Sequence, residues 1–171
     1  LALTAGIALP GHAAEPQKAG ATASVTIRAT QPITGKLDIS LANEVSAAQK
    51  RALDWLAARQ KPDGSWSDTN FPALTALPLW AFTQSDHPAK AAVVSNAVRF
   101  ILTCVQPDGG IYRNIPGKGG GLANYNTALG MVALNAVGNP ALIPVVQRAR
   151  KFVAAGQLLE GDDVYRGGMG Y

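Results

Sequence analysis

The chain repeats one helical pattern at a fixed spacing. Residues 88–100 (PAKAAVVSNAVRF) and 140–152 (PALIPVVQRARKF) are identical at six of thirteen positions, 52 residues apart. Residues 75–82 (TALPLWAF) and 127–134 (TALGMVAL) show the same spacing. A unit of about fifty residues that recurs in this way builds a stack in which each unit covers the apolar face of its neighbour. The spacing therefore predicts a repeated helix hairpin, present about two and a half times.

The apolar residues recur at steps of three and four, which is typical of amphipathic helices. In residues 43–60 they form one stripe, made of Val45, Ala48, Ala52, Trp55 and Leu56. No segment alternates as a half-buried strand would. We therefore predict an all-α fold, with further helices over residues 71–84, 86–105, 124–137 and 139–157.

Some helix ends can also be predicted. Pro78 removes a backbone hydrogen bond, so we expect a kink near it or a later start of its helix. Asn124 or Asn126 is expected to cap the fourth helix and Gly138 to end it. The single cysteine, Cys104, lies in an apolar helical stretch and is predicted to be an inert buried thiol.

Three parts follow one another along the chain. Residues 1–13 (LALTAGIALPGHA) have the apolar run and small residues of a signal peptide's end, which predicts cleavage after Ala13 and export; a frayed apolar start of a cytosolic protein is the alternative. Residues 14–40, rich in Ala, Thr, Gly and Pro, are predicted to be a linker. Residues 41–171 hold the hairpins, with predicted bounds 41–84, 86–137 and 139–171. No transmembrane segment is expected, because the apolar runs are too short.

The first helix of each unit ends in a similar turn sequence. The copies read LAARQKPDGSW (56–66) and TCVQPDGGIY (103–112), and a third runs from Gln157 to Gly161. Pro and Asp favour turn entry, and Gly adopts backbone conformations that other residues resist. The Gln amide can bond carbonyls at a helix end while it packs on an indole. We interpret these endings as joints between hairpins and not as catalytic sites.

The endings resemble the QW motif of squalene–hopene and oxidosqualene cyclases and the related repeats of protein prenyltransferase β subunits. The first copy matches best; in the second, Gln is displaced by one position and Tyr replaces Trp. Residues 120–134 (GGLANYNTALGMVAL) also resemble the inner-helix segment of exported bacterial proteins with prenyltransferase/squalene-oxidase repeats. The motif positions, interpreted as structural, are Trp55, Gln60, Gly64, Trp66, Phe100, Gln106, Gly109, Tyr112, Phe152, Gln157 and Gly161.

The resemblance implies an (α/α) toroid, present here as an incomplete ring, with outer helices carrying the QW ends and inner helices around a central cavity. In such a toroid the starts of the inner helices and their preceding loops approach the cavity. This makes four residues candidate ligand contacts, namely Asp68, Asn70, Asn124 and Tyr125, with Asn126 beside them. Helix capping is the alternative role of the asparagines. Trp80 and Phe82 either line an apolar cavity or belong to the core.

No catalytic or metal set is predicted within these residues. The cyclases protonate their substrate with a DxDD cluster, and the nearest string is EGDD (160–163), which lies in a turn, lacks the flank of that motif and is interpreted as solvated. The prenyltransferases bind zinc through Asp, Cys and His, but Leu102 stands where Cys104 would need the Asp, and no three ligands are suitably spaced. We expect no metal and no cofactor.

Two further site types are excluded by the sequence. The glycine-rich residues 109–121 follow a helix and lack Ser or Thr after Lys118, so they do not form a nucleotide phosphate loop. A Ser–His–Asp set is not expected, because His87 is the one histidine that would remain after cleavage.

The charge pattern gives no support for nucleic-acid binding. The net charge is +4, but its one close cluster, Arg148, Arg150 and Lys151, lies on a helix face without interleaved aromatic residues. An apolar or isoprenoid-like small molecule, or a protein, remains as the partner. The first hypothesis is an exported binding scaffold. The alternative is an N-terminal fragment of a squalene–hopene-type cyclase, or of another toroid enzyme, with catalytic residues beyond residue 171.

Overall fold

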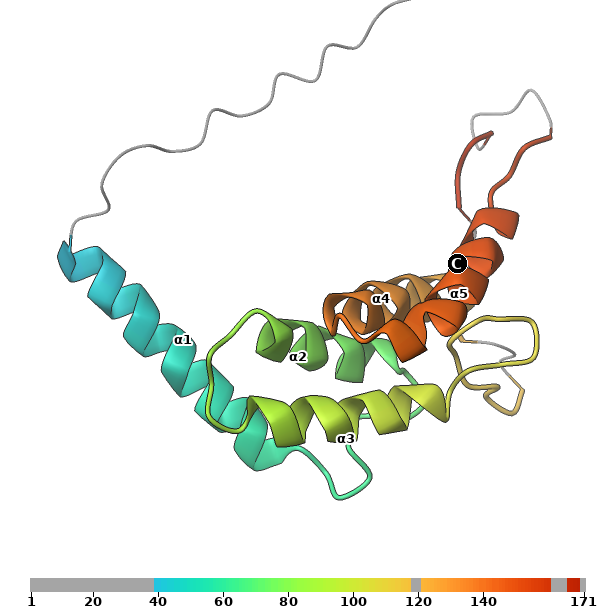
Figure 1. Ribbon diagram of the computed structural model, residues 1–171. Coiled ribbons are helices and arrows are strands. Elements are labelled where there is room, and N and C mark those ends of the chain that lie inside the picture. Colours follow the sequence, from blue (N-terminus) through green and yellow to red (C-terminus); the bar gives the residue numbers. More distant parts are fainter. Residues whose placement is uncertain (1–38, 118–120, 161–165, 170–171) are drawn as a thin grey trace, which may run out of the picture. The chain divides into compact units, whose positions relative to one another are not determined.

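The computed structural model describes residues 39–117, 121–160 and 166–169, which contain five α-helices (Figure 1). The helices are α1 (Ile39–Arg59), α2 (Ala73–Thr83), α3 (Lys90–Leu102), α4 (Ala123–Ala136) and α5 (Ile143–Ala155), with a 3-10 turn, η1 (Pro140–Leu142), directly before α5. Isolated β-bridges join Val105 to Ile111 and Gln157 to Met169, and these residues contain no strand. The all-α prediction is confirmed for this part of the chain.

Helices α2 and α4 pack against each other, with α3 on α2 and α5 on α4 (Figure 1). The largest fully buried apolar side chains belong to these helices and to the turn after α3: Leu79, Phe82, Ile101, Ile111 and Leu134. Each side chain of this size stabilises the fold by about 1.5–3 kcal/mol when it is removed from water. The core therefore forms where α2, α3, α4 and α5 meet.

Helix α1 is covered by other parts of the chain to a much smaller extent than α2, α3, α4 and α5. It has no buried residue, although Leu53 and Leu56 pack partly against the core. Trp55 is 53% exposed, and the Arg59 guanidinium lies 4.1 Å from the centre of its indole. The predicted apolar stripe is therefore only partly covered. The helix begins at Ile39, so the last two residues of the predicted linker are helical.

The observed helix ends correct several expectations. Helix α3, for example, starts at Lys90 and not at residue 86, and it ends at Leu102, before Cys104. Helix α4 starts after Leu122, whose φ is +57°, and it has no side-chain cap, so the prediction that Asn124 or Asn126 caps it is wrong. Gly138, with φ of +71°, follows the end of α4 as predicted. Helix α2 starts two residues later than predicted and includes Pro78.

Several predicted features lie outside the described residues. They are the signal peptide (1–13), the linker up to residue 38, and residues 161–163 of the EGDD string with the motif glycine Gly161.

Candidate functional site

The turn after α1 ties that helix to α3. The Gln60 Nε2 atom donates to the carbonyl of Gly64 at 3.1 Å and to that of Val93 in α3 at 3.0 Å. Gly64 has φ of +90°, and a Cβ at this position would lie 2.1 Å from the carbonyl oxygen of Asn96. Both the backbone conformation and the close approach of α3 therefore require glycine.

The turn after α3 makes similar contacts with α5. The Gln106 Nε2 atom donates to the carbonyl of Tyr112 at 2.8 Å. Gly109 has φ of +92°, and a Cβ there would lie 3.0 Å from the carbonyl oxygen of Arg148 in α5. The Tyr112 ring lies 5.7 Å from that of Phe152. In each of these two turns a glycine with positive φ packs on helix backbone: the turn after α1 packs on α3, and the turn after α3 packs on α5.

Two buried threonines join the turns to α2 and α4. The backbone N–H of Trp66 donates to Thr75 Oγ1 of α2 at 3.2 Å, and that of Ile111 donates to Thr127 Oγ1 of α4 at 2.8 Å. The Trp66 indole N–H donates to the carbonyl of Leu56, in the last turn of α1, at 2.8 Å. The indole therefore satisfies a helix-end carbonyl, a role that the sequence analysis gave to the Gln amide.

The turn after α5 has the same local hydrogen bonds in a more exposed setting. The Gln157 Nε2 atom donates to the carbonyl of Gly167 at 2.9 Å, and Gly167 has φ of +85°. Backbone bonds link Leu158 with Gly167 and Gly168. Here the left-handed glycine within the described residues is Gly167, whereas the sequence analysis assigned the motif to Gly161.

The four candidate ligand contacts lie at the starts of α2 and α4. Asp68 Oδ1 accepts the backbone N–H of Asn70 at 2.9 Å, so this carboxylate shapes the exposed loop before α2. Asn70 lines a cavity of about 370 Å³ beside the end of α3. The Asn124 side chain lies against Gly156 at the end of α5, where it leaves no room for a Cβ. Tyr125 is 45% exposed.

Asn126 joins α4 to α2. Its Oδ1 atom accepts the N–H of Ala73, the first residue of α2, at 3.0 Å, and its Nδ2 atom donates to the carbonyl of Gly121 at 2.8 Å. The side chain is fully buried. Asn126 therefore caps the neighbouring helix and not its own, and both ends of its amide are occupied.

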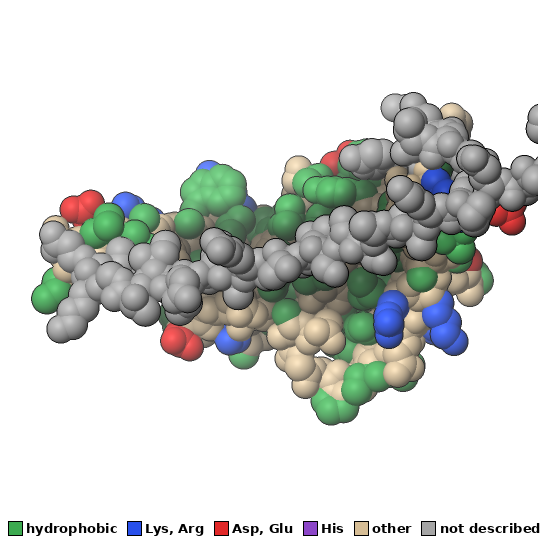
Figure 2. All heavy atoms as spheres, turned by 90° about the horizontal axis from the view of Figure 1, so that it is seen from above, with side chains coloured by type: hydrophobic (Ala, Val, Ile, Leu, Met, Phe, Trp, Pro, Cys, Tyr) green, Lys and Arg blue, Asp and Glu red, His purple; other side chains and the backbone are tan. Residues whose placement is uncertain are grey.

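Helices α2 and α4 both carry exposed apolar side chains. Because Ala73 bonds to Asn126, the two helices start side by side, and Figure 1 shows that they run in the same direction. Phe82 is fully buried, whereas Trp80 is 42% exposed. In Figure 2 hydrophobic side chains are visible at several places on one face of the molecule, among charged and other groups. We call the exposed set on these two helices the α2–α4 surface: Leu74, Leu77, Trp80, Tyr125 and Val132.

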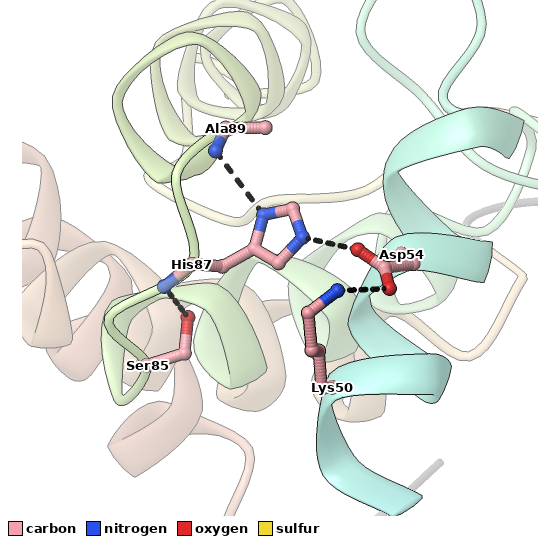
Figure 3. Close-up of polar contacts among 5 residues, drawn as sticks. All are labelled: Lys50, Asp54, Ser85, His87 and Ala89. Atoms are coloured by element: carbon pink, nitrogen blue, oxygen red, sulfur yellow. Dashed lines mark hydrogen bonds and ion pairs between the residues drawn. The ribbon is translucent and has the colours of Figure 1, made fainter. Parts of the chain in front are cut away.

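A serine, a histidine and an aspartate come together between α1 and the start of α3 (Figure 3). His87 Nε2 lies 3.0 Å from Asp54 Oδ1, and His87 Nδ1 accepts the N–H of Ala89 at 3.1 Å. The Nε2 atom therefore carries the ring hydrogen and donates a hydrogen bond to the carboxylate. Ser85 Oγ donates to the carbonyl of Phe82 at 3.0 Å. Both ring nitrogens are occupied, so His87 is not placed to activate Ser85 as a nucleophile.

The same histidine and aspartate help to hold α1 in place. Lys50 Nζ binds Asp54 Oδ2 at 2.8 Å, and the hydrogen bonds from Lys50 and His87 hold the pKa of Asp54 below its usual value. The His87 side chain is 6% exposed and meets the Phe82 ring edge-on at 5.4 Å. A groove of about 660 Å³ runs between α1 and the loop before α3. This contact could not be predicted from the sequence, because Asp54 and His87 are 33 positions apart.

Redox and metal chemistry have little support in the described residues. Cys104 is fully buried, and burial raises the pKa of its thiol, so the reactive thiolate is disfavoured. No group of three or more His, Cys, Asp or Glu side chains is placed to hold a metal ion in the part of the chain that the structure describes.

No protein-family model, curated protein or solved structure matches the chain. Among the described helices, none combines the length and the apolar character that crossing a membrane requires.

Proposed function

We propose that the protein is an exported binding scaffold of the (α/α) toroid type, built from repeated helix hairpins, and that it binds an apolar, isoprenoid-like molecule. In this proposal α1, α3 and α5 are outer helices, and α2 and α4 are inner helices that face the ligand. The turns with Gln and Gly join neighbouring hairpins and take no part in chemistry.

Paired contacts at the repeat spacing support the proposed architecture. Gly64 and Gly109 are 45 positions apart, and they pack on backbone atoms of Asn96 and Arg148, which are 52 positions apart. Thr75 and Thr127 are also 52 positions apart, and each accepts a backbone N–H from the turn that precedes its helix. Chance similarity of short sequences would not place equivalent residues in equivalent contacts.

One observation carries the proposed binding function: the α2–α4 surface exposes large apolar side chains on the two helices that are proposed to be inner. Trp80 and Val132, which are 52 positions apart, are 42% and 38% exposed. We infer that these side chains form one patch, and an exposed apolar patch of this kind usually marks a binding surface. Among the described polar clusters, the Asp54–His87 pair is engaged in helix packing, and the buried amide of Asn126 is engaged in capping α2.

Equilibrium dialysis of the full chain with radiolabelled farnesol tests this function. We expect saturable binding that Trp80→Ser weakens about tenfold, since the indole would lose apolar contact with the ligand. Trp55→Ser is the matched control, because Trp55 is similarly exposed but lies on α1. Absence of binding, or equal losses in both variants, would overturn the proposal. Conversion of squalene to a cyclic product would replace it with the cyclase alternative.

Export is tested separately by sequencing the N-terminus of the protein recovered outside the cytoplasm. We expect it to begin at Ala14. Recovery of uncleaved protein in the cytoplasm alone would contradict this part of the proposal.

A further inference from the structure

The cavity that Asn70 lines is an open pocket made of residues other than those of the α2–α4 surface. It has a volume of about 370 Å³ and is bordered by the loop before α2, the end of α3 and the segment after the second turn. Two guanidinium groups line it, those of Arg99 and Arg113, together with the neutral polar side chains of Thr69, Asn70 and Thr103. Such a combination offers many hydrogen-bond donors in a confined volume.

Arg113 is held in place on one side of this cavity. Its Nη2 atom donates to Thr103 Oγ1 at 3.0 Å, and its guanidinium carbon lies 5.5 Å from the centre of the Phe100 ring. The Thr103 hydroxyl uses its own proton in a bond to the carbonyl of Phe100 at 2.7 Å. The guanidinium is therefore positioned by a hydroxyl acceptor and an aromatic face.

Within the described residues, Arg113 forms no ion pair with a carboxylate. Its guanidinium interacts with the Cys104 thiol, but among the same residues its buried Nε atom has no hydrogen-bond partner. The ion pairs found within the described residues involve Lys50, His87 and Asp54, and neither arginine of the cavity. A buried guanidinium N–H without an acceptor is costly, and such groups commonly indicate an ion or water that belongs at the site.

Arg99 supplies the second positive charge. Its Nη2 atom donates to Asn96 Oδ1, one turn earlier in α3, at 2.9 Å, and its other N–H groups remain available. Among the described residues that line the cavity, Asp63 is the one acid. Its Oδ1 atom accepts from the backbone N–H and the hydroxyl of Ser65, at 2.9 and 2.7 Å. One carboxylate against two guanidiniums leaves the cavity with a net positive charge.

We propose that this cavity binds a small oxyanion, the carboxylate or phosphate group of a soluble metabolite, between Arg99 and Arg113. The planar guanidinium fork matches the oxygens of either group, and charge-assisted bonds of this kind are strong. Asn70 and Thr69 supply neutral donors at the mouth, and the Phe100 ring forms an apolar wall. The inference does not depend on the proposed function, because it uses different residues and a different ligand class.

Isothermal titration calorimetry of the full chain at low salt, with inorganic phosphate and with succinate as probes, tests this inference. We expect saturable one-site binding of at least one probe, weakened about tenfold or more by Arg113→Gln and by Arg99→Gln, since each removes charge-assisted hydrogen bonds. Arg150→Gln is the matched control: it removes the same charge from an exposed position on α5 and should change the affinity by less than about twofold. Binding should also shift the NMR signal of the Arg113 Nε–H group, whereas a purely structural role would leave that signal unmoved.

Three results would overturn the inference. The first is absence of saturable binding of both probes to a chain whose circular dichroism shows that it is folded. The second is an equal loss of affinity in Arg150→Gln, which would indicate diffuse attraction by the net charge. The third is binding only to vesicles with anionic phospholipids, which would make the oxyanion a lipid headgroup. If Arg113→Gln fails to fold, Arg99→Gln still decides the outcome, because Arg99 is on the exposed side of α3.

Discussion

The turns after α3 and α5 share a pattern of backbone hydrogen bonds but have very different surroundings. In each, a Gln amide donates to a carbonyl of the turn, and a glycine adopts positive φ. In the first, Ile111 is fully buried and its N–H bonds to a threonine of α4, whereas in the second Met169 is 49% exposed. The turn geometry is therefore encoded locally, while its burial depends on a helix that packs over it.

Among variants that test the contrast between buried and exposed turns, Trp66→Ala is expected to change the free energy of unfolding most. Trp66 occupies the place of Ile111 in the turn after α1, is 5% exposed and bonds to both α1 and α2. Its removal should lower the free energy of unfolding by about 3–5 kcal/mol. Met169→Ala, in the exposed turn, should change it by less than about 0.5 kcal/mol. Urea unfolding followed by circular dichroism measures both, and similar losses would contradict the contrast between buried and exposed turns.

The glycines of the same turns should respond unequally to a methyl group. Gly64→Ala places a Cβ 2.1 Å from the carbonyl oxygen of Asn96 and strains a φ of +90°, so we expect a loss on the order of 3 kcal/mol. Gly167→Ala strains a φ of +85° but meets no atom within 4 Å, so the loss should be about 1 kcal/mol. The same unfolding experiment applies. Equal losses would mean that backbone conformation, and not contact with α3, is what demands glycine.

A smaller, pH-dependent effect is expected from Cys104, next to the buried turn after α3. Burial raises the pKa of this thiol in the folded chain. In the unfolded chain the pKa of the thiol is about 8.5, and below this pH the contribution of the buried thiol to the free energy of unfolding is fully present. Above it, the unfolded chain loses a proton that the folded chain keeps, so stability falls as pH rises. The alkaline decrease should be shallower in Cys104→Ala than in the wild type, as measured by urea unfolding between about pH 7 and 9.5.

The control for this effect is Tyr112→Phe. The hydrogen bond from Tyr112 to Asp108 raises the pKa of the phenol, so its contribution is lost with rising pH in the same direction, but at higher pH. The prediction would be contradicted if the loss of stability below about pH 9.5 disappeared in Tyr112→Phe and persisted in Cys104→Ala. That result would attribute the loss to Tyr112 and not to Cys104.

The helices and the turns that follow them could be located from the sequence, because both depend on nearby residues. Periodicity located α1 to α5, and Gly138 marked the end of α4. The role of Asn126 could not be found in this way, because the N–H that it caps lies 53 positions earlier. Arg113 could not be identified in this way either, because nothing near it in the sequence indicates that its Nε atom is buried or that it shares a cavity with Arg99.

The bond between Ala73 and Asn126 also bears on the order in which the chain folds. Helices α2 and α3 are joined by a short loop, so they can pair early, whereas α2 and α4 meet only after a segment of about fifty residues has closed. The Asn126 amide fixes the alignment of two parallel helices at this late step. Its loss should therefore accelerate unfolding and leave the refolding rate nearly unchanged.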